Sequence, residues 1–311
     1  MDVLSDVVSA ARTGRPHANL VTRSAPFARR FPAVPAAGFH VVLRGTCRLL
    51  PPQGAPIPLG PGDVVFLPRG AAHGLAGDPS ATEPPAPLAA DHEDRGDGTP
   101  TGRSRAVVML CGGYLLDGSA PHPLLSDLPE VVHLPARAGR HRELRAAVEL
   151  LGAELGGAEL GGDARPGADA VLTGLLDLLL LYILRAWLDD RRAAGHAAAG
   201  WAAALHDPAV AAALHAVHDD PARPWTVAEL AARARLSRAA FARRFTRLVG
   251  RPPLAYLTWW RMTVAARLLR TTDAPVDAIA RRVGYSSQYT FAHAFRRQFG
   301  SPPGRYRHRT G

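Results

Sequence analysis

Two arginines on one predicted helix have the chemistry to read DNA bases. Arg238 and Arg243 alternate with Phe241 and Phe245 at spacings that place the two kinds of residue on different sides of a helix over 238–249. The phenylalanines would face inward and the arginines outward. A guanidinium can donate two hydrogen bonds to O6 and N7 of guanine in the major groove. Arg243 is therefore our first candidate for a base contact.

The same pattern of residue types occurs again fifty positions later. Just upstream, similar residues are offset by forty-nine, so the second copy has one extra residue in its turn. The outward side of the second helix carries Gln288, whose amide could pair with N6 and N7 of adenine. The identical pairs are Ser237 and Ser287, Phe241 and Phe291, Phe245 and Phe295, Arg247 and Arg297, Gly250 and Gly300, Pro252 and Pro302, Pro253 and Pro303, and Tyr256 and Tyr306.

Cap and stop residues bound the helices of this repeat. Ser237 can act as an N-cap, because its hydroxyl can accept from an amide that has no partner at the helix start. Gly250 and Gly300, each followed by a pair of prolines, mark the ends of the outward-facing helices. Apolar residues at helical intervals predict one long helix over 253–270. Residues 208–311 are thus predicted to form an all-α domain in which a long helix joins two helix-turn-helix motifs.

The positive charge of the chain is concentrated in the same region. Residues 208–311 hold 18 arginines, no lysine and 5 acidic residues, a net charge of +13, whereas the first 207 residues carry −3. Cationic side chains that neutralise phosphates release counterions and so favour binding to nucleic acid. A basic surface can also serve solubility alone, but its coincidence with the duplicated motif favours DNA as the partner.

Residues 225–307 resemble the DNA-binding domain of the AraC/XylS family of bacterial transcription regulators. The likeness is strongest at 284–291 and 295–307, which follow the family signature almost position by position. The resemblance implies binding to double-stranded DNA, contact with RNA polymerase and activation of transcription. It places the base-reading positions at Ala239, Ala242 and Arg243 of the first helix and at Gln288, Tyr289, Ala292 and His293 of the second.

Further arginines near these helices are predicted to bind phosphates, with surface ion pairs as the alternative. The first recognition helix carries more arginine than the second, so we expect it to give the stronger base readout. The second would adjust the register or meet the polymerase. The predicted DNA contacts are Arg238, Ala239, Arg243, Arg247, Arg261, Gln288, Tyr289, His293 and Arg297.

A different motif lies in the first half of the chain. Gly62, Pro68, Gly70 and His73 fit the pattern Gly-x5-Pro-x-Gly-x2-His, and residues 39–45 resemble the end of the motif that precedes it in cupin barrels. Short apolar runs at 40–43, 47–50 and 64–67 predict a small antiparallel barrel. Residues 1–135 therefore resemble the cupin-type sensor domain at the N-terminus of many AraC-family regulators.

The metal ligands of cupin enzymes are missing from the first motif. Counting back from Gly45, the usual glutamate position holds Gly38, and the usual histidine pair falls near Phe31 and Ala33. This departure weighs against the alternative function, a cupin dioxygenase or isomerase fused to a nucleic-acid-binding module. We expect a regulator and not an enzyme.

Four residues remain as candidates for an effector site: His40, His73, Cys47 and Cys111. They could simply pack, with the histidines satisfied by hydrogen bonds and the cysteines in the core. His40, His73 and Cys111 could instead bind zinc or another divalent metal, since coordination requires convergence in space and not sequence spacing. Cys111 could also act as a redox or electrophile sensor. The effector is thus a small molecule, a metal or an oxidant.

Two helices are predicted over 140–155 and 168–192, after the barrel. The second contains an all-apolar run at 178–184, which is wider than one buried face requires. Family resemblance implies pairing with a second subunit through Leu175, Leu179, Tyr182 and Ile183, and packing on the chain's own barrel is the alternative. Residues 78–105 are predicted to form a surface loop and residues 195–200 an interdomain hinge.

The predicted fold class is α+β and multidomain. A cupin-like β-barrel spans 1–135, a helical dimerisation or linker region spans 136–200, and the DNA-binding domain spans 208–311. Asp2 and Asp6 interrupt the first eleven residues, which lack the apolar core of a signal peptide. Asp177 and Arg185 likewise interrupt the apolar run at 175–188. We expect a cytoplasmic homodimer with no membrane association.

Overall fold

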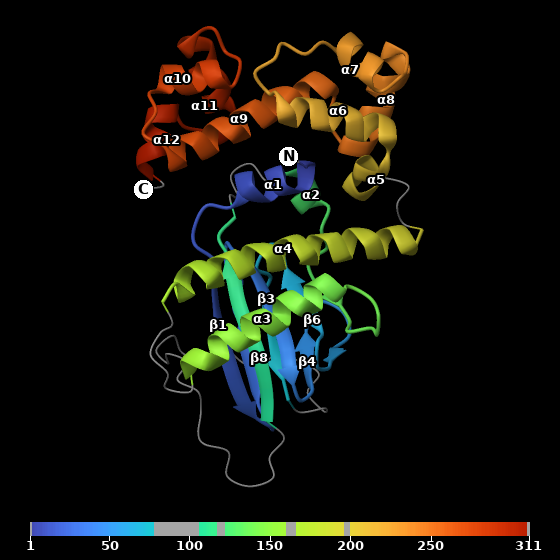
Figure 1. The fold of residues 1–311 in the computed structure, drawn as a ribbon, viewed down its shortest axis with the longest axis vertical. Helices are drawn as coiled ribbons and strands as arrows, with labels where there is room; N and C mark the ends of the chain where they lie inside the picture. The colour runs from blue at the N-terminus through green and yellow to red at the C-terminus, as the bar shows by residue number, and fades with distance from the viewer. Residues whose placement is uncertain (1, 78–105, 117–121, 160–165, 196–199, 310–311) are drawn as a thin grey trace. The chain divides into compact units, whose positions relative to one another are not determined.

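The computed structural model describes residues 2–77, 106–116, 122–159, 166–195 and 200–309, which form two compact units (Figure 1). The sheet unit comprises Gly14–Leu116 and Leu128–Trp187, and the helical unit comprises Met1–Thr13, Asp117–Asp127 and Leu188–Gly311. Two short segments distant in sequence therefore belong with the C-terminal helices. The predicted boundaries at 135, 200 and 208 assumed contiguous domains and stay predictions. The predicted loop at 78–105 and hinge residues 196–199 lie outside the described residues.

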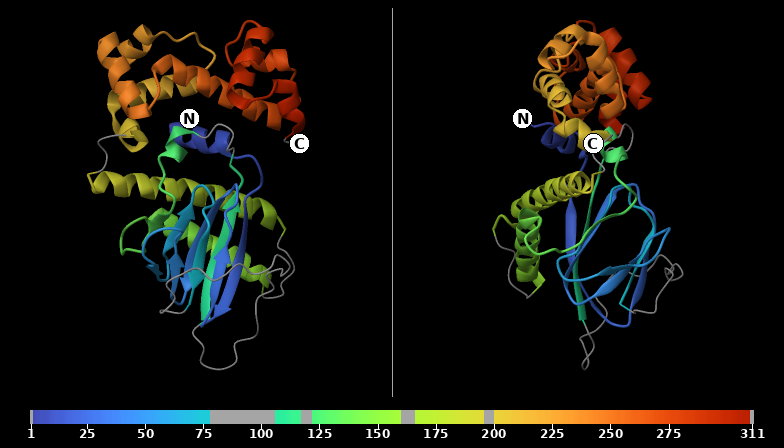
Figure 2. Two further views of the ribbon diagram at one scale, coloured as in Figure 1. Left: turned by 180° about the vertical axis from the view of Figure 1, so that it is seen from behind. Right: turned by 90° about the vertical axis from the view of Figure 1, so that its right-hand side faces the viewer.

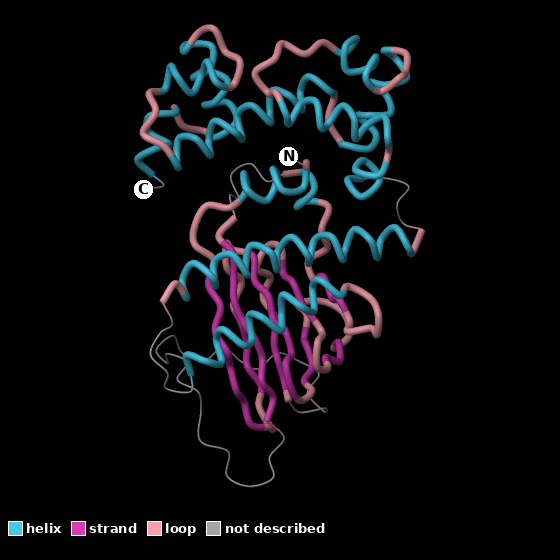
Figure 3. The backbone as a smooth tube through the Cα atoms, viewed as in Figure 1, coloured by secondary structure: helices cyan, strands magenta, loops and turns pink. Residues whose placement is uncertain are grey.

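The described strands of the sheet unit pair antiparallel and form two sheets (Figure 3). The five-stranded sheet has the order β1 (His17–Ser24), β8 (Ala106–Tyr114), β3 (Ala37–Arg44), β6 (Val64–Leu67) and β9 (Val132–Leu134). The four-stranded sheet has the order β2 (Ala28–Phe31), β7 (His73–Ala76), β4 (Cys47–Leu50) and β5 (Ile57–Leu59). The apolar runs predicted as strands lie in β3, β4 and β6, which confirms them.

Both sheets contribute side chains to one apolar core. Val42 and Met109 from the five-stranded sheet are buried in the same cluster as Leu49 and Leu75 from the four-stranded sheet. Successive side chains of a strand point to opposite faces, so each strand sends alternate residues into this shared layer. The described strands thus build a two-sheet cupin-like unit, while closure into a single barrel stays a prediction.

Two helices cover the outer face of the five-stranded sheet (Figure 2). They are α3 (Arg142–Glu159) and α4 (Ala168–Ala193), which confirms both predicted helices. Tyr114 of β8 is fully buried and its hydroxyl donates to the carbonyl of Leu176 in α4 at 2.8 Å. This cover explains why the run at 64–67 is buried at every position instead of alternating.

The burial pattern of α4 contradicts two of the four predicted dimer contacts, while Leu175 and Tyr182 are half-buried and stay predictions. Leu179 and Ile183 are fully buried within the chain, whereas the exposed apolar side chains on α3 and α4 are Leu150, Val171 and Leu178. By length and composition α4 could also cross a membrane, since its most apolar window has a mean hydropathy of 1.9. Inside the protein, 44% of that window is buried, so this single helix is weak evidence for a membrane span.

The helical unit combines the two ends of the chain. Its short helix α1 was not predicted, although Asp2 caps it by accepting from the amide of Ser5. The long α9 and the helices on either side of it confirm the predicted all-α region. The helices are α1 (Val3–Ala11), α2 (Pro123–Ser126), α5 (Gly200–His206), α6 (Pro208–Asp219), α7 (Val227–Arg233), α8 (Arg238–Val249), α9 (Pro253–Thr271), α10 (Val276–Arg282), α11 (Gln288–Phe299) and α12 (Pro303–Arg309).

Helices α7 and α8 form a first helix pair, and α10 and α11 form a second. Four residues separate the helices of the first pair and five separate those of the second, which confirms the extra residue in the second turn. Ser237 and Ser287 accept from backbone amides as N-caps. Gly250 and Gly300 end α8 and α11 with φ of 79° and 72°, the left-handed conformation that glycine adopts without strain.

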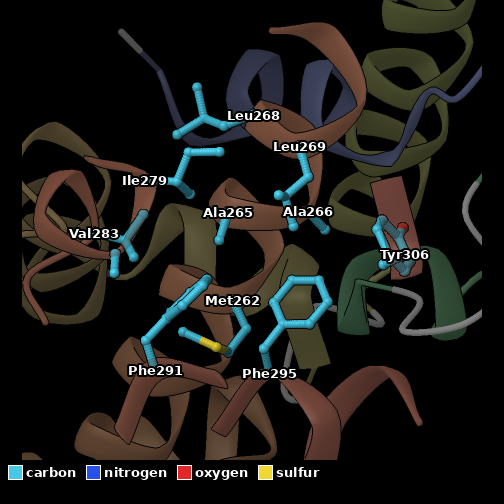
Figure 4. Close-up of a cluster of buried hydrophobic side chains, with 11 residues drawn as sticks. Met262, Ala265, Ala266, Leu268, Leu269, Ile279, Val283, Phe291, Phe295 and Tyr306 are labelled. Carbon is cyan, nitrogen blue, oxygen red and sulfur yellow. The ribbon is translucent and has the colours of Figure 1, made fainter. Parts of the chain in front are cut away.

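The second helix pair rests on an apolar cluster (Figure 4). Phe291 and Phe295 of α11 point toward Met262 of α9, and Ile279 of α10 lies on the same cluster. Each of these side chains is at most 1% exposed. Burial of such side chains stabilises by about 1.5 to 3 kcal/mol each, so this cluster fixes the orientation of α11.

Candidate nucleic-acid interface and pocket of the sheet unit

Helix α8 separates a buried face from an exposed one, as its periodicity predicts. Phe241 and Phe245 are fully buried, whereas Arg238, Ala239 and Arg243 are exposed. Arg247, the predicted phosphate ligand near the end of α8, is exposed too. The structure therefore brings the predicted contacts of the first copy onto one accessible surface with three guanidinium groups.

Helix α11 presents a different chemistry on its exposed face. Gln288, Tyr289 and His293 are exposed, and the ring of Tyr289 is 84% exposed despite its apolar body. An aromatic side chain held in solvent by a rigid helix is suited to contact with a base or a partner. Arg296 and Arg297 are exposed near the end of α11. The second face thus carries an amide, an aromatic ring and an imidazole besides its guanidiniums, whereas the polar side chains predicted to contact DNA on the first face are all guanidiniums.

Arg261 lies apart from these two faces. Its guanidinium donates to the backbone carbonyls of Pro221, Ala222 and Arg223 at 2.6, 3.2 and 2.9 Å. Burial lowers its pKa below the ordinary value for arginine. These bonds hold the 221–223 segment against α9, so Arg261 has a structural role. Its predicted contact with DNA stays a prediction.

A chain of four buried polar side chains supports the first helix pair. His218 of α6 donates from Nδ1 to the carboxylate of Asp6 at 3.2 Å, and the hydroxyl of Tyr256 in α9 donates to Nε2 of His218 at 2.7 Å. His122 accepts from the amide of Leu124 at Nδ1, which leaves Nε2 to donate to the Tyr256 oxygen at 3.4 Å. Burial lowers the pKa of both histidines, although Asp6 opposes this for His218.

Sequence reasoning missed this chain because its members are remote from one another. Asp6 and His218 are separated by 212 positions, and no spacing rule links them. Only the capping role of Asp2 could have indicated a helix at the N-terminus. The chain matters for the interface because Tyr256 also packs against Phe245, whose burial orients α8.

In the sheet unit, three of the four predicted effector residues come together. His73 donates from Nδ1 to the carbonyl of Ala71 at 2.8 Å, since that oxygen can only accept. Its Nε2 must then accept from Nε2 of His40 at 2.8 Å, which leaves Nδ1 of His40 to accept from the thiol of Cys111 at 3.1 Å. The tautomers follow from the carbonyl and give one ordered chain that ends at a thiol.

Burial keeps this chain uncharged. Burial, with a smaller contribution from His73, lowers the pKa of His40 to about 3, and burial also lowers the pKa of His73. Burial raises the pKa of Cys111 to about 12, so its resting form is the thiol and not the reactive thiolate. Cys47 lies elsewhere in the core, 4.0 Å from the sulfur of Met109, and its pKa is raised to about 11.

The three residues do not fit a common metal ion as they stand. His73 and Cys111 contact opposite ring nitrogens of His40, so no single point lies within bonding distance of all three donors. Across the part of the chain that the structure describes, no group of three His, Cys, Asp or Glu side chains could hold a metal ion. The geometry favours the hydrogen-bonded reading over the zinc hypothesis.

Comparison with known proteins agrees with this two-part architecture. A family model described as cupin matches residues 2–189, and one described as a helix-turn-helix domain matches residues 230–309. An AraC-like transcription regulator of Streptomyces lividans is 36% identical over 309 residues, 99% of this chain and 98% of that protein. The RCS-specific HTH-type transcriptional activator RclR of Escherichia coli is 31% identical over 273 residues, 87% of this chain and 84% of that protein. The solved DNA-binding domain of AdpA, in complex with a target DNA, is 41% identical and covers 33% of this chain and 92% of that domain, with a TM-score of 0.32.

A cupin domain followed by a helix-turn-helix domain, in a chain whose full-length relatives are transcription regulators, defines a DNA-binding transcription regulator and not an enzyme. The chain belongs to the AraC family of these regulators.

Proposed function

We propose that both helix pairs are helix-turn-helix readers, with α8 and α11 each in a major groove of the same DNA duplex. The observation that carries this proposal is the shared division of α8 and α11 into a buried phenylalanine face and an exposed polar face. Two readers on one face of B-DNA would meet grooves roughly 34 Å apart. The first reader contributes Arg238, Ala239, Arg243 and Arg247, and the second contributes Gln288, Tyr289, His293 and Arg297.

The sheet unit is proposed to sense an effector and to pass the signal through its own strands. β1 and β8 pair along their length, with His17 opposite Gly113. The residues before β1 form α1 and those after β8 lead into α2, and both helices belong to the helical unit. A ligand that shifts either strand would therefore act on chain segments that lead to α1, which packs against α6 and α9, and to α2, which packs against α5. In this proposal the signal passes along the chain itself, so no second protein is needed to carry it.

The remaining functional proposals concern regulation and assembly. Activation is proposed because the relative RclR is named a transcriptional activator, and an activator contacts RNA polymerase. A homodimer is proposed through Leu150, Val171 and Leu178, the exposed apolar residues of α3 and α4. A DNA-binding regulator without a second candidate span among the described residues is proposed to act in the cytoplasm.

Footprinting of the full chain on DNA upstream of its own gene tests the DNA-reading proposal. The expected result is two protected major-groove segments on one face of the duplex, about one helical turn apart. Arg145→Ala, which alters an exposed arginine on α3, serves as the matched control and leaves the footprint unchanged. A single protected segment would contradict the proposal that both pairs read DNA.

Light scattering tests the dimer separately. We expect a dimer at micromolar concentration, and Leu178→Asp should shift it to a monomer because a carboxylate would be buried in an apolar contact. The control is Arg185→Asp, also exposed and also on α4. A wild-type monomer at this concentration contradicts the dimer.

A further inference from the structure

A cavity of about 280 Å³ lies within the sheet unit, between its two sheets. Every second residue of β1 from His17 to Arg23 lines it, and Arg29 and Phe31 line it from β2. This alternation is what a strand gives when one face borders a space and the other borders its neighbours. The cavity therefore follows from the regular pairing of the strands in the two sheets. Its size suits one small molecule.

The lining combines cationic and apolar groups. Two guanidiniums, those of Arg23 and Arg29, border the cavity, and no aspartate or glutamate occurs among the residues that line it. Both arginines also interact with other groups of the chain, so a ligand would add to contacts that already exist. Most of the remaining wall is apolar, formed by Phe27, Phe31, Leu67, Leu75 and Met109.

The two guanidiniums act on the same part of the cavity. Burial and the charge of Arg23 both lower the pKa of Arg29, and both arginines favour the charged form of Cys111. The Arg29 guanidinium lies 5.6 Å from the centre of the Phe31 ring, and that ring stacks on His73 at 4.8 Å. Because both guanidiniums border one cavity, an anion bound there could pair with either or both of them.

The histidines do not supply the positive charge. His40 and His73 are neutral members of the chain that ends at the Ala71 carbonyl, and their ring nitrogens are already engaged. An anion in the cavity would consequently depend chiefly on the arginines, and His17 of β1, which also lines the cavity, could add a hydrogen bond. Arginine remains protonated at any pH at which the protein is folded, so the charge of the site does not change near neutrality.

We propose that this cavity binds a small organic carboxylate, with its anionic group at Arg23 and Arg29 and its apolar body against Phe31, Leu75 and Met109. This inference rests on the proposed sensing function of the sheet unit and names the chemical class of its effector. Bidentate pairing with a guanidinium fixes the carboxylate, and the apolar wall selects against small inorganic anions.

Calorimetric titration of the full chain with linear carboxylates from acetate to decanoate, and with benzoate, tests the proposal. The matched primary amides have nearly the same shape and no charge. We expect saturable binding by at least one carboxylate, no binding by its amide, and the same affinity at pH 7 and pH 8.5. Equal binding of acid and amide, or no binding of any carboxylate at millimolar concentration, overturns the proposal. Affinity that disappears between these pH values overturns the assignment of the charge to arginine.

Variants of the cavity locate the ligand. Arg29→Gln should weaken carboxylate binding at least tenfold, whereas Arg30→Gln, the exposed neighbour on the opposite face of β2, should leave it unchanged. Gly38→Leu should abolish binding by filling the cavity, because a side chain at Gly38 meets only Leu67 and the Gly112 carbonyl, at 3.8 and 3.9 Å. Unaltered binding to Gly38→Leu that folds normally places the ligand elsewhere and overturns the proposal.

The outcome is distinguishable from failure of the proposed function. If footprinting finds two protected segments but no carboxylate binds, the DNA readers stand and this inference falls. If a carboxylate binds and does not alter either footprint or reporter transcription, the cavity site stands and the sensing proposal falls. Both measurements use the same full-length protein.

Discussion

The two helix pairs share one sequence pattern, but different kinds of buried contacts support them. Tyr256 and Tyr306 occupy equivalent positions of the repeat, and both are buried. The hydroxyl of Tyr256 joins a chain of buried histidines that reaches Asp6 in the N-terminal helix, whereas the Tyr306 hydroxyl accepts from Arg270 at 2.7 Å beside an apolar cluster. The repeated sequence thus fixes where the reading helices lie, whereas residues outside the repeat also provide buried contacts that support each of them.

Because of this difference, we expect the first helix pair to change conformation more readily than the second. The first pair depends on polar groups from α1 and from the segment before α2, which are continuous with the strands that border the cavity. The second pair depends mainly on Phe291, Phe295 and their apolar neighbours on the C-terminal helices. Arg270 also links the Tyr306 hydroxyl to the Ala10 carbonyl of α1. The support of the second pair is mostly apolar, whereas that of the first is a chain of polar bonds, so we expect a signal from the sheet unit to alter the first pair more than the second.

The largest effect is expected at the turn of the second pair. Gly284 has φ of 81°, and a β-carbon there would overlap the carbonyl of Ala222. Its counterpart in the first pair is Arg235, which adopts φ of 53° and is exposed. We expect Gly284→Ala to destabilise by about 3 kcal/mol, from backbone strain plus steric overlap, and Arg235→Gly to change stability by less than about 1 kcal/mol. Urea unfolding of both variants measures this, and equal effects would contradict a difference between the turns.

The next effect concerns DNA recognition. Arg243→Ala should reduce discrimination at one operator position by about 1 to 3 kcal/mol, because a guanidinium pairs with guanine through two bonds. His293→Ala, four positions beyond Tyr289 on α11, should cost less, and Arg297→Ala should weaken all sequences alike. Titrations on operators mutated at single positions measure the loss of binding free energy for each variant. A uniform loss of affinity for Arg243→Ala would remove it from the base-reading set.

The buried polar chain should respond to removal of its carboxylate. Asp6→Ala leaves the Nδ1 hydrogen of His218 without its partner in a buried site and should destabilise by about 1 to 3 kcal/mol. Asp277→Ala removes an exposed ion pair with Arg281 in the second pair and should cost at most about 1 kcal/mol. Hydrogen exchange should localise the first loss to α6–α9. Loss of protection confined to α10–α12 is the contrary result.

Mild acid should affect the first pair before the second. His122 and His218 have lowered pKa in the folded protein, so below about pH 6.5 the unfolded chain binds more protons than the folded one. The stability that these histidines contribute should be fully present above that pH and should decline as the pH falls toward their folded pKa values. Exchange at pH 7.5 and pH 6, corrected for intrinsic rates, should show loss at α7 and α8. An equal loss in both pairs contradicts the comparison.

Local patterns correctly predicted which faces of α8 and α11 are buried and which are exposed, because such patterns are properties of single helices. The spacing of Phe241 and Phe245 defines which side of α8 is buried. Because Arg238 and Arg243 lie on the other side of the helix, they are exposed. Period-two alternation predicted that His40 lies on the inward face of its strand, and both His40 and His73 line the cavity. The contacts that join His40 to His73 and Cys111 depend on how the strands pair, which residue spacing does not determine.

The sequence by itself determined the family, by its resemblance to family motifs, and also the two helix pairs with their unequal turns, the basic region and three strands of the cupin-like unit. The helix pairs, the basic region and these strands follow from periodicity, capping and charge, which act over a few residues. Tertiary structure alone decided that α1 and α2 belong to the helical unit, that Arg261 ties backbone and that Leu179 is buried. The reason is physical: burial and hydrogen bonding between residues such as Asp6 and His218 depend on how the chain closes, and no local preference records that closure.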